Sequence, residues 1–169
     1  MLKKKAQVFT FDVFMSLIFF VSVFTIWLLI TNQLVEQASY AYEINMLDKK
    51  LQRASDLLIR SKGVPEDWDS NNVKAFGLAG DTEYIVSEEK ISKFLSAGID
   101  KIKSSLGFGG YNLYIRFANI TGEDFDPANP YEIGSFPNNP KIVVSIKRYF
   151  LIDFNGNRDL AMMQMIVWR

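Results

Sequence analysis

An uncharged apolar run from Val13 to Ile30 restricts what this chain can fold into more than any other feature of its sequence. Ser16, Ser22 and Thr25 are its only polar members. As an α-helix the run would extend about 27 Å, close to the hydrocarbon thickness of a bilayer, which is roughly 30 Å. The alternative is a helix buried in a soluble core, which would need a polar stripe that this run lacks. We therefore expect a transmembrane helix, to which residues 7–31 are assigned.

The two flanks of the apolar run differ in charge, and this difference predicts its orientation. Three lysines at positions 3–5 precede the run, whereas uncharged polar residues and Glu36 follow it. Positively charged flanks stay on the cytoplasmic side of a membrane. The sequence thus predicts a single-pass protein of the cell membrane, in contact with membrane lipid. Its N-terminus is expected in the cytoplasm and its C-terminal domain outside the cell.

Helical character is expected to continue beyond the membrane. Residues 33–61 contain no proline or glycine, and apolar residues recur there every three or four positions. Lys62 and Gly63 then provide a cationic last turn and a C-cap glycine, and Pro65 prevents continuation. Residues 32–62 are therefore predicted to form an extracellular continuation of the helix.

The remaining residues, 63–169, are expected to form one small domain of mixed structure. Ser87 is the expected N-cap of a helix that ends near Leu95, and a second short helix is expected to end before Gly107. After Gly110 the apolar residues alternate with period two, which predicts strands. These strands are placed at 111–117, near 131–133, at 142–147 and in a run that ends at Trp168, with a turn at Asn155-Gly156.

Together these elements predict an α+β fold. A long N-terminal helix, first transmembrane and then amphipathic, is expected to pack on a small antiparallel β-sheet domain with short helices. Leu47, Leu51, Ala54 and Leu58 are expected to meet one face of the sheet. Trp68 is the only aromatic residue of the loop 64–72, and we expect it to pack on the domain rather than to bind a partner.

Composition excludes several kinds of chemistry. The chain contains no cysteine and no histidine, which removes disulfides, thiol catalysis, Ser-His-Asp catalysis and the usual structural zinc sites. The 19 basic residues balance the 19 acidic ones and none cluster after Lys5, so no nucleic-acid partner is predicted. No phosphate-binding loop or nucleophile motif is present. We therefore expect no enzyme activity and no cofactor.

The segment 120–140 is rich in proline, glycine and acids, and predicts a long surface loop. Glu123, Asp124, Asp126 and Asn129 carry oxygen ligands of the kind that Ca²⁺ prefers. Their spacing matches no standard calcium loop, so no metal site is predicted.

The residues Asn119-Ile120-Thr121 form a glycosylation sequon. The use of a sequon requires that the domain lies outside the cytoplasm, as the charge flanking the apolar run predicts. Asn119 is therefore a candidate glycan acceptor.

The order of the N-terminal segments is unusual for a secretory signal. A conventional signal peptide is cut after its hydrophobic segment, so that cutting removes this segment. Here the only small residue after the basic run, Ala6, precedes the apolar run. Cutting after Ala6 would leave the helix on the mature protein.

In this respect the chain resembles an archaeal type IV pilin-like protein with a class III, prepilin-type signal peptide. The junction Lys5-Ala6-Gln7-Val8 is similar to the sites cut by the prepilin-type leader peptidase of that family. The segments GVPEDW (63–68) and FGLA (76–79) and the closing Val167-Trp168 also resemble recurring stretches of exported pilin-like archaeal proteins. The resemblance implies that residues 1–6 are a cleaved leader.

The resemblance also implies how the protein would assemble. Mature subunits, identical or related, would pack through their N-terminal hydrophobic helices into a helical filament on the cell surface, with the leader peptidase and an assembly platform as further partners. The residues expected to carry assembly are those at the start of the helix and its phenylalanines: Phe9, Phe11, Asp12, Phe14, Phe19, Phe20 and Phe24.

Asp12 departs from the pattern of the family. Type IV pilins commonly carry a glutamate at the fifth mature position, where it is thought to pair with the N-terminal amine of a neighbour, but counted from Gln7 this position is Phe11. An offset of one residue turns a helical side chain by about 100°. Asp12 is therefore either an interfacial acid or an imperfect partner for the amine of Gln7.

Two functions follow from these observations. The first is a pilin-like structural subunit of a type IV pilus-type filament. The alternative is a membrane-anchored surface protein that does not polymerise, such as a minor pilin, an assembly factor or an adhesion or binding module.

Overall fold

The long N-terminal helix predicted from the sequence is present in the structure. The computed structural model describes residues 2–80, 82–154 and 156–169, and it describes side chains of the first helix from Phe11 onward. That helix, α1 (Leu2–Arg60), is continuous. The chain divides into two compact units, Met1–Glu43 and Ile44–Arg169, so the last turns of α1 belong to the globular unit.

The globular unit has the predicted α+β composition. Its two short helices and its strands lie close to the expected positions, except that the strand expected at 142–147 continues to Phe154. The short strand Ile85–Ser87 is the one element that was not predicted. After α1 the elements are β1 (Ile85–Ser87), α2 (Glu88–Ser96), α3 (Ile99–Ser105), β2 (Asn112–Asn119), β3 (Glu132–Gly134), β4 (Val143–Phe154) and β5 (Asn157–Trp168).

The strands form one sheet in the order β1-β4-β5-β2-β3. Strands β4 and β5 form a long hairpin, and β2 pairs with the other edge of β5 and with β3, always in antiparallel orientation. The exception is β1, which pairs in parallel with Leu151–Asp153 of β4. This strand was not predicted, because three residues are too few to show a period of two.

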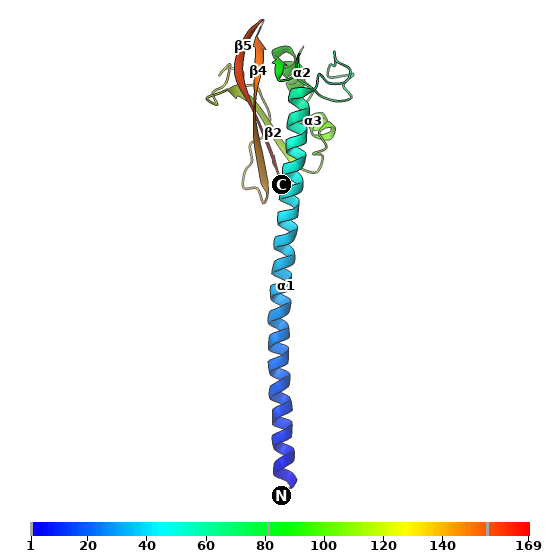
Figure 1. The fold of residues 1–169 in the computed structure, drawn as a ribbon, viewed down its shortest axis with the longest axis vertical. Coiled ribbons are helices and arrows are strands. Elements are labelled where there is room, and N and C mark those ends of the chain that lie inside the picture. The colour runs from blue at the N-terminus through cyan, green and yellow to red at the C-terminus, as the bar shows by residue number, and fades with distance from the viewer. Residues whose placement is uncertain (1, 81, 155) are drawn as a thin grey trace. The chain divides into compact units, whose positions relative to one another are not determined.

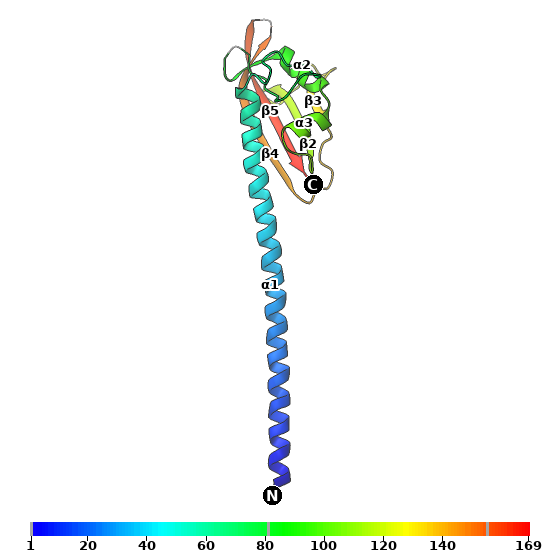
Figure 2. The ribbon, with the colours of Figure 1, turned by 90° about the vertical axis from the view of Figure 1, so that its right-hand side faces the viewer.

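One face of the sheet carries the core of the globular unit. Leu47, Leu51 and Leu58 of α1 are fully buried there, as predicted, and Phe94 of α2 and Ile102 of α3 are fully buried with them. Figures 1 and 2 show the end of α1, α2 and α3 on the same side of the sheet. Removing each such side chain from water contributes about 1.5 to 3 kcal/mol to folding. The inward side chains of the sheet include Leu113, Ile115, Phe117, Val144, Phe150, Ile152, Ala161, Met163, Met165 and Val167.

A chain of aromatic rings runs through this core. Trp68 is 1% exposed, which confirms that it packs on the domain. Its ring meets Phe76 edge-on at a centroid distance of 5.2 Å, and Phe76 meets Phe94 at 5.2 Å. Phe117 continues the series from α2 into the sheet, at 6.3 Å from Phe94 and 6.3 Å from Phe150. Edge-to-face contacts of this kind add to the free energy of area burial.

At β2, the opposite face of the sheet is covered by the segment between β2 and β4, whereas the same face of β4 is exposed. Arg116 of β2 forms an ion pair with Asp124 at 2.9 Å and donates to the carbonyl oxygen of Gly122 at 3.1 Å. The ring of Phe136 packs edge-on against Tyr114 at 5.5 Å. This segment is the long surface loop that the sequence predicted, and it contains the short strand β3.

Candidate assembly helix and surface sites

The side chains of α1 between Phe11 and Ile30 are all exposed. The exposed fraction is 73% for Phe19 and 48% for Phe24. Among the described residues, α1 is the one helix that is long and apolar enough to cross a membrane, and its apolar window is not buried at all. The structure is therefore compatible with membrane anchoring through this segment.

Two of the three polar side chains of the apolar run, and Thr31 directly after it, bond within the helix. The hydroxyl groups of Ser22, Thr25 and Thr31 each donate to the carbonyl oxygen four residues earlier, at 2.8 Å. In hydrocarbon an unpaired hydroxyl would cost free energy, because no water is available to accept its hydrogen bond. Local bonding removes most of that cost, so these residues do not oppose insertion.

Three aromatic residues form a stripe along one side of the segment. Phe20 stacks on Phe24 at a centroid distance of 6.2 Å, and Phe24 stacks on Trp27 at 5.8 Å. Among the expected assembly phenylalanines whose side chains are described, the structure brings together Phe20 and Phe24. Phe11, Phe14 and Phe19 are exposed elsewhere on the helix surface.

Asp12 is exposed on α1 at the start of the apolar segment. Among the residues whose side chains are described, none forms an ion pair with it. Its candidate partner, the amine of Gln7, lies outside the residues whose side chains are described, as do Lys5, Ala6, Val8 and Phe9 of the predicted processing and assembly sites. The role of Asp12 therefore remains a prediction.

Asn119 ends strand β2 and begins a tight turn. Its backbone N–H donates to the carbonyl oxygen of Glu123 at 2.9 Å, and Gly122 donates its N–H to the carbonyl oxygen of Asn119 at 3.0 Å. Gly122 has a φ of +89°, a conformation that favours glycine. Thr121, the third residue of the sequon, is exposed in this turn.

The acids of the following loop each have a separate local partner. Asp124 pairs with Arg116, and Asp126 accepts hydrogen bonds from the side chain of Asn129 and the N–H of Ala128, at 3.1 and 2.9 Å. The hydrogen bond from Asn129 and then that from Ala128 lower the pKa of Asp126 below its usual range. Within the described chain no group of three acidic, histidine or cysteine side chains could hold a metal ion.

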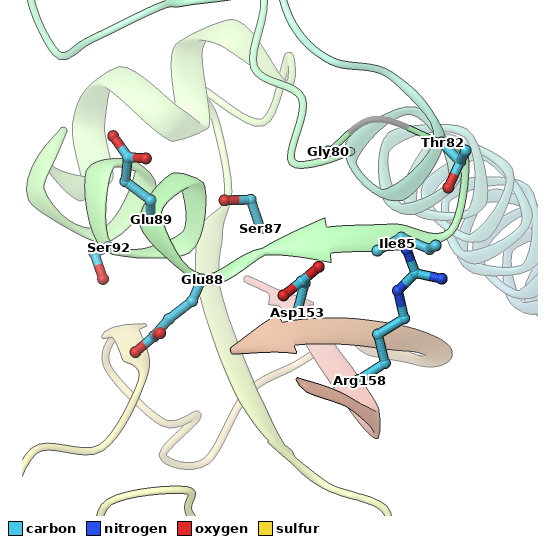
Figure 3. Close-up of a pocket in the computed structure, with 9 residues that line it drawn as sticks. All are labelled: Gly80, Thr82, Ile85, Ser87, Glu88, Glu89, Ser92, Asp153 and Arg158. Atoms are coloured by element: carbon cyan, nitrogen blue, oxygen red, sulfur yellow. The ribbon is translucent and has the colours of Figure 1, made fainter. Parts of the chain in front are cut away.

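A polar pocket of about 370 Å³ lies between β1, the start of α2 and the β4–β5 hairpin. Figure 3 shows its side chains, with Glu88 and Glu89 on the first turn of α2 and Asp153 and Arg158 on the hairpin. This pocket could not be predicted, because its lining comes from segments far apart in the chain. Ser87 occupies the predicted N-cap position, but its hydroxyl makes no capping hydrogen bond.

Each acid of the pocket is paired with another group of the protein. Glu89 forms an ion pair with Lys93 at 2.6 Å, which lowers the pKa of its carboxyl. Glu88 accepts a hydrogen bond from the hydroxyl of Tyr131 at 2.9 Å. Asp153 accepts one from the N–H of Gly156 at 2.7 Å. These contacts hold each of the three carboxylates in place locally.

Lys90 joins α2 to the segments that follow α1. Its ammonium donates to the carbonyl oxygens of Lys62 and Ala79, at 2.8 and 2.9 Å. Burial, followed by the charge of Lys62, lowers the pKa of Lys90 below its ordinary value. Because both acceptors are backbone carbonyls, the ammonium acts as a structural bridge.

Comparison with protein families, with curated proteins and with solved structures finds no match to this chain. A function must therefore be inferred from the residues and their geometry.

Proposed function

We propose that this protein is a pilin-like structural subunit of an archaeal type IV pilus-type surface filament. The observation that carries the proposal is that every apolar side chain of α1 between Phe11 and Ile30 is exposed, by 42% at Leu28 to 73% at Phe19. Leaving a large apolar side chain in water rather than burying it costs about 1.5 to 3 kcal/mol. A segment with this many exposed apolar groups needs either lipid or other protein helices around it.

The proposed assembly uses both environments in turn. Before assembly, the segment lies in the membrane, with the globular unit outside the cell. On assembly its side chains exchange lipid for neighbouring helices, an exchange driven by close packing because lipid is as apolar as the helix surface. A head-to-tail contact that repeats without closing produces a filament.

Processing after Ala6 prepares the subunit for this exchange. Removal of residues 1–6 takes away three of the 19 basic residues and none of the 19 acidic ones, so the formal side-chain charge moves from zero to minus three. It also creates a free amine at Gln7. In the proposed filament this amine pairs with Asp12 of a neighbouring subunit, which offsets the cost of placing a carboxylate near hydrocarbon.

The second candidate is a membrane-anchored surface protein that does not polymerise. The position of Asp12 favours it, since the acid lies one residue after the fifth mature position and is turned by about 100° from it. Lipid alone would also satisfy the exposed apolar segment. In this case the globular unit acts outside the cell as a minor pilin, an assembly factor or an adhesion module.

Processing and fractionation of the native protein separate the two candidates. Surface filaments are sheared from cells, and the N-terminal sequence of this protein is determined in the filament and membrane fractions. Gln7 as the first residue in sheared filaments supports the filament subunit. Gln7 confined to membranes supports the second candidate, and an intact lysine-rich leader confined to membranes contradicts the filament subunit.

A further inference from the structure

The turn that follows β2 holds the side chain of Asn119 in a defined orientation. Its Oδ1 accepts two hydrogen bonds, from the hydroxyl of Thr121 at 2.6 Å and from the N–H of Glu123 at 2.8 Å. Its Nδ2 donates one hydrogen to the carboxylate of Glu123 at 3.2 Å. The amide and the threonine hydroxyl of the sequon are therefore already in contact in the folded domain.

We propose that the folded domain presents Asn119 Nδ2 as the acceptor of an N-linked glycan. This inference rests on the proposed location of the domain outside the cell, because the sugar donors of this reaction are used on that side of the membrane. It does not require that the protein polymerises.

The hydrogen bonds of the Asn119 amide leave one of its two N–H hydrogens available for replacement by a sugar. A primary amide carries two hydrogens on its nitrogen. Glu123 accepts one, and no described group accepts the other. A glycan that replaces the second hydrogen breaks no contact of the turn. Asn119 itself is half-buried at the end of β2, and the next two residues, Ile120 at 54% exposed and Thr121, are exposed, so the acceptor lies at the edge of the protein surface.

The proposed reaction transfers a glycan from a membrane lipid. Asn119 Nδ2 attacks the anomeric carbon of a sugar that is joined through phosphate to a polyprenyl lipid. The nitrogen–carbon bond forms as the bond from the anomeric carbon to the phosphate oxygen breaks. The lipid phosphate leaves with that electron pair, and the displaced amide proton passes to a base of the membrane transferase. Nothing is oxidised or reduced.

Asn129 provides a matched comparison within the same loop. Its Nδ2 also donates to a nearby carboxylate, that of Asp126 at 3.1 Å, and its side chain is exposed. It is followed by Pro130 and lacks a hydroxyl residue two positions later, so it is not a sequon. Asn119 is the only sequon asparagine in the sequence. A modification that depends on the sequon should therefore occur at Asn119 and not at Asn129.

Mass spectrometry of the full-length protein isolated from its own cells tests the proposal. Trypsin releases the peptide 117–141, which contains both asparagines. We expect this peptide to carry a glycan that fragmentation localises to Asn119. Fully unmodified peptide, or a glycan localised to Asn129, would overturn the proposal.

Four variants in the same cells complete the test. Asn119→Gln and Thr121→Val should abolish the glycan, whereas Thr121→Ser and Asn129→Gln should retain it. Retention of the glycan in Thr121→Val would contradict the role of the hydroxyl. The N-terminal residue is read in the same samples. If the protein carries the glycan but keeps its leader, the filament subunit is rejected and the glycan site is supported. If the protein starts at Gln7 but is unmodified, the glycan site is rejected and processing of the filament subunit is supported.

Discussion

Gly63 lies so close to Trp68 that a Cβ atom added to the glycine would be 2.3 Å from Cδ1 of the indole. Gly63 lies three residues after the end of α1 at Arg60 and has a φ of +90°, a conformation that favours glycine. The position is therefore restricted twice, by its backbone conformation and by the ring packed against it. The indole Nε1–H in turn donates to the carbonyl oxygens of Lys62 and Gly77, at 3.1 and 2.9 Å.

Gly63→Ala should destabilise the globular unit by about 2 to 4 kcal/mol, since it combines backbone strain with overpacking of a rigid ring. The free energy of unfolding is measured by urea denaturation of the full-length protein in detergent. Gly98→Ala is the matched control, because Gly98 has a φ of +87° and nothing within 4 Å of the added Cβ. It should cost only about 1 kcal/mol. Equal losses in the two variants would show that Trp68 moves aside freely.

Trp68→Phe tests the hydrogen bonds of the indole. Lys62 keeps a donor in this variant, because its carbonyl oxygen also accepts from Lys90 at 2.8 Å. The buried carbonyl oxygen of Gly77 loses the indole N–H that donates to it, which predicts a loss of about 1 to 3 kcal/mol in the free energy of unfolding. Trp27→Phe, on the exposed apolar segment, is the control and should leave this free energy unchanged. A loss below about 0.5 kcal/mol for Trp68→Phe would mean that water replaces the indole.

Much of the fold could be predicted because its signals are local. The spacing of Leu47, Leu51 and Leu58 shows which side of α1 is buried, and all three are fully buried. The alternation in β2 and β4 and the glycines around the short helices likewise depend on residues close in sequence. These patterns identify helices, strands and their faces without knowledge of their partners.

The remaining features depend on contacts between distant segments. Gly77 is an example: a Cβ atom there would be 2.3 Å from the carbonyl oxygen of Ser61, a contact that no local pattern indicates. The parallel pairing of Ile85–Ser87 with β4 and the polar pocket beside it arise in the same way. Of the candidate sites, the sequon was visible in the sequence, but the hydrogen bonds that orient Asn119 were not.

Tyr114 should make the stability of the globular unit depend on pH in the alkaline range. Burial, followed by the hydrogen bond that its hydroxyl donates to Glu132, raises the pKa of Tyr114 to about 12 from an ordinary value of 10.0. Between these two values the folded state holds the phenol proton that the unfolded state has lost. The free energy of unfolding should therefore fall as the pH rises from about 10 to about 12.

Comparison of the wild type with Tyr114→Phe isolates this contribution from those of other titrating groups. The urea midpoint of each protein is measured across the same alkaline range, and tyrosinate absorbance reports the ionisation itself. The wild type should lose more stability with rising pH than the variant. Parallel curves for the two proteins would show that the phenol ionises without affecting the fold.

Asp12→Ala separates the two interpretations of the acid at the start of the apolar segment. If Asp12 pairs with the amine of Gln7 in a filament, its loss leaves that amine unpaired near hydrocarbon, and the yield of sheared filaments should fall about tenfold or more. If Asp12 is only an interfacial acid, filament yield should stay constant, and membrane association should be unchanged or stronger because a carboxylate near lipid has been removed.

Glu36→Gln, at another exposed acid of α1 beyond the apolar segment, controls for loss of negative charge on the helix. For each variant, filament yield and membrane association are measured by quantitative immunoblotting of the sheared and membrane fractions. An equal fall in filament yield for both variants would assign the effect to net charge rather than to a pair with Gln7.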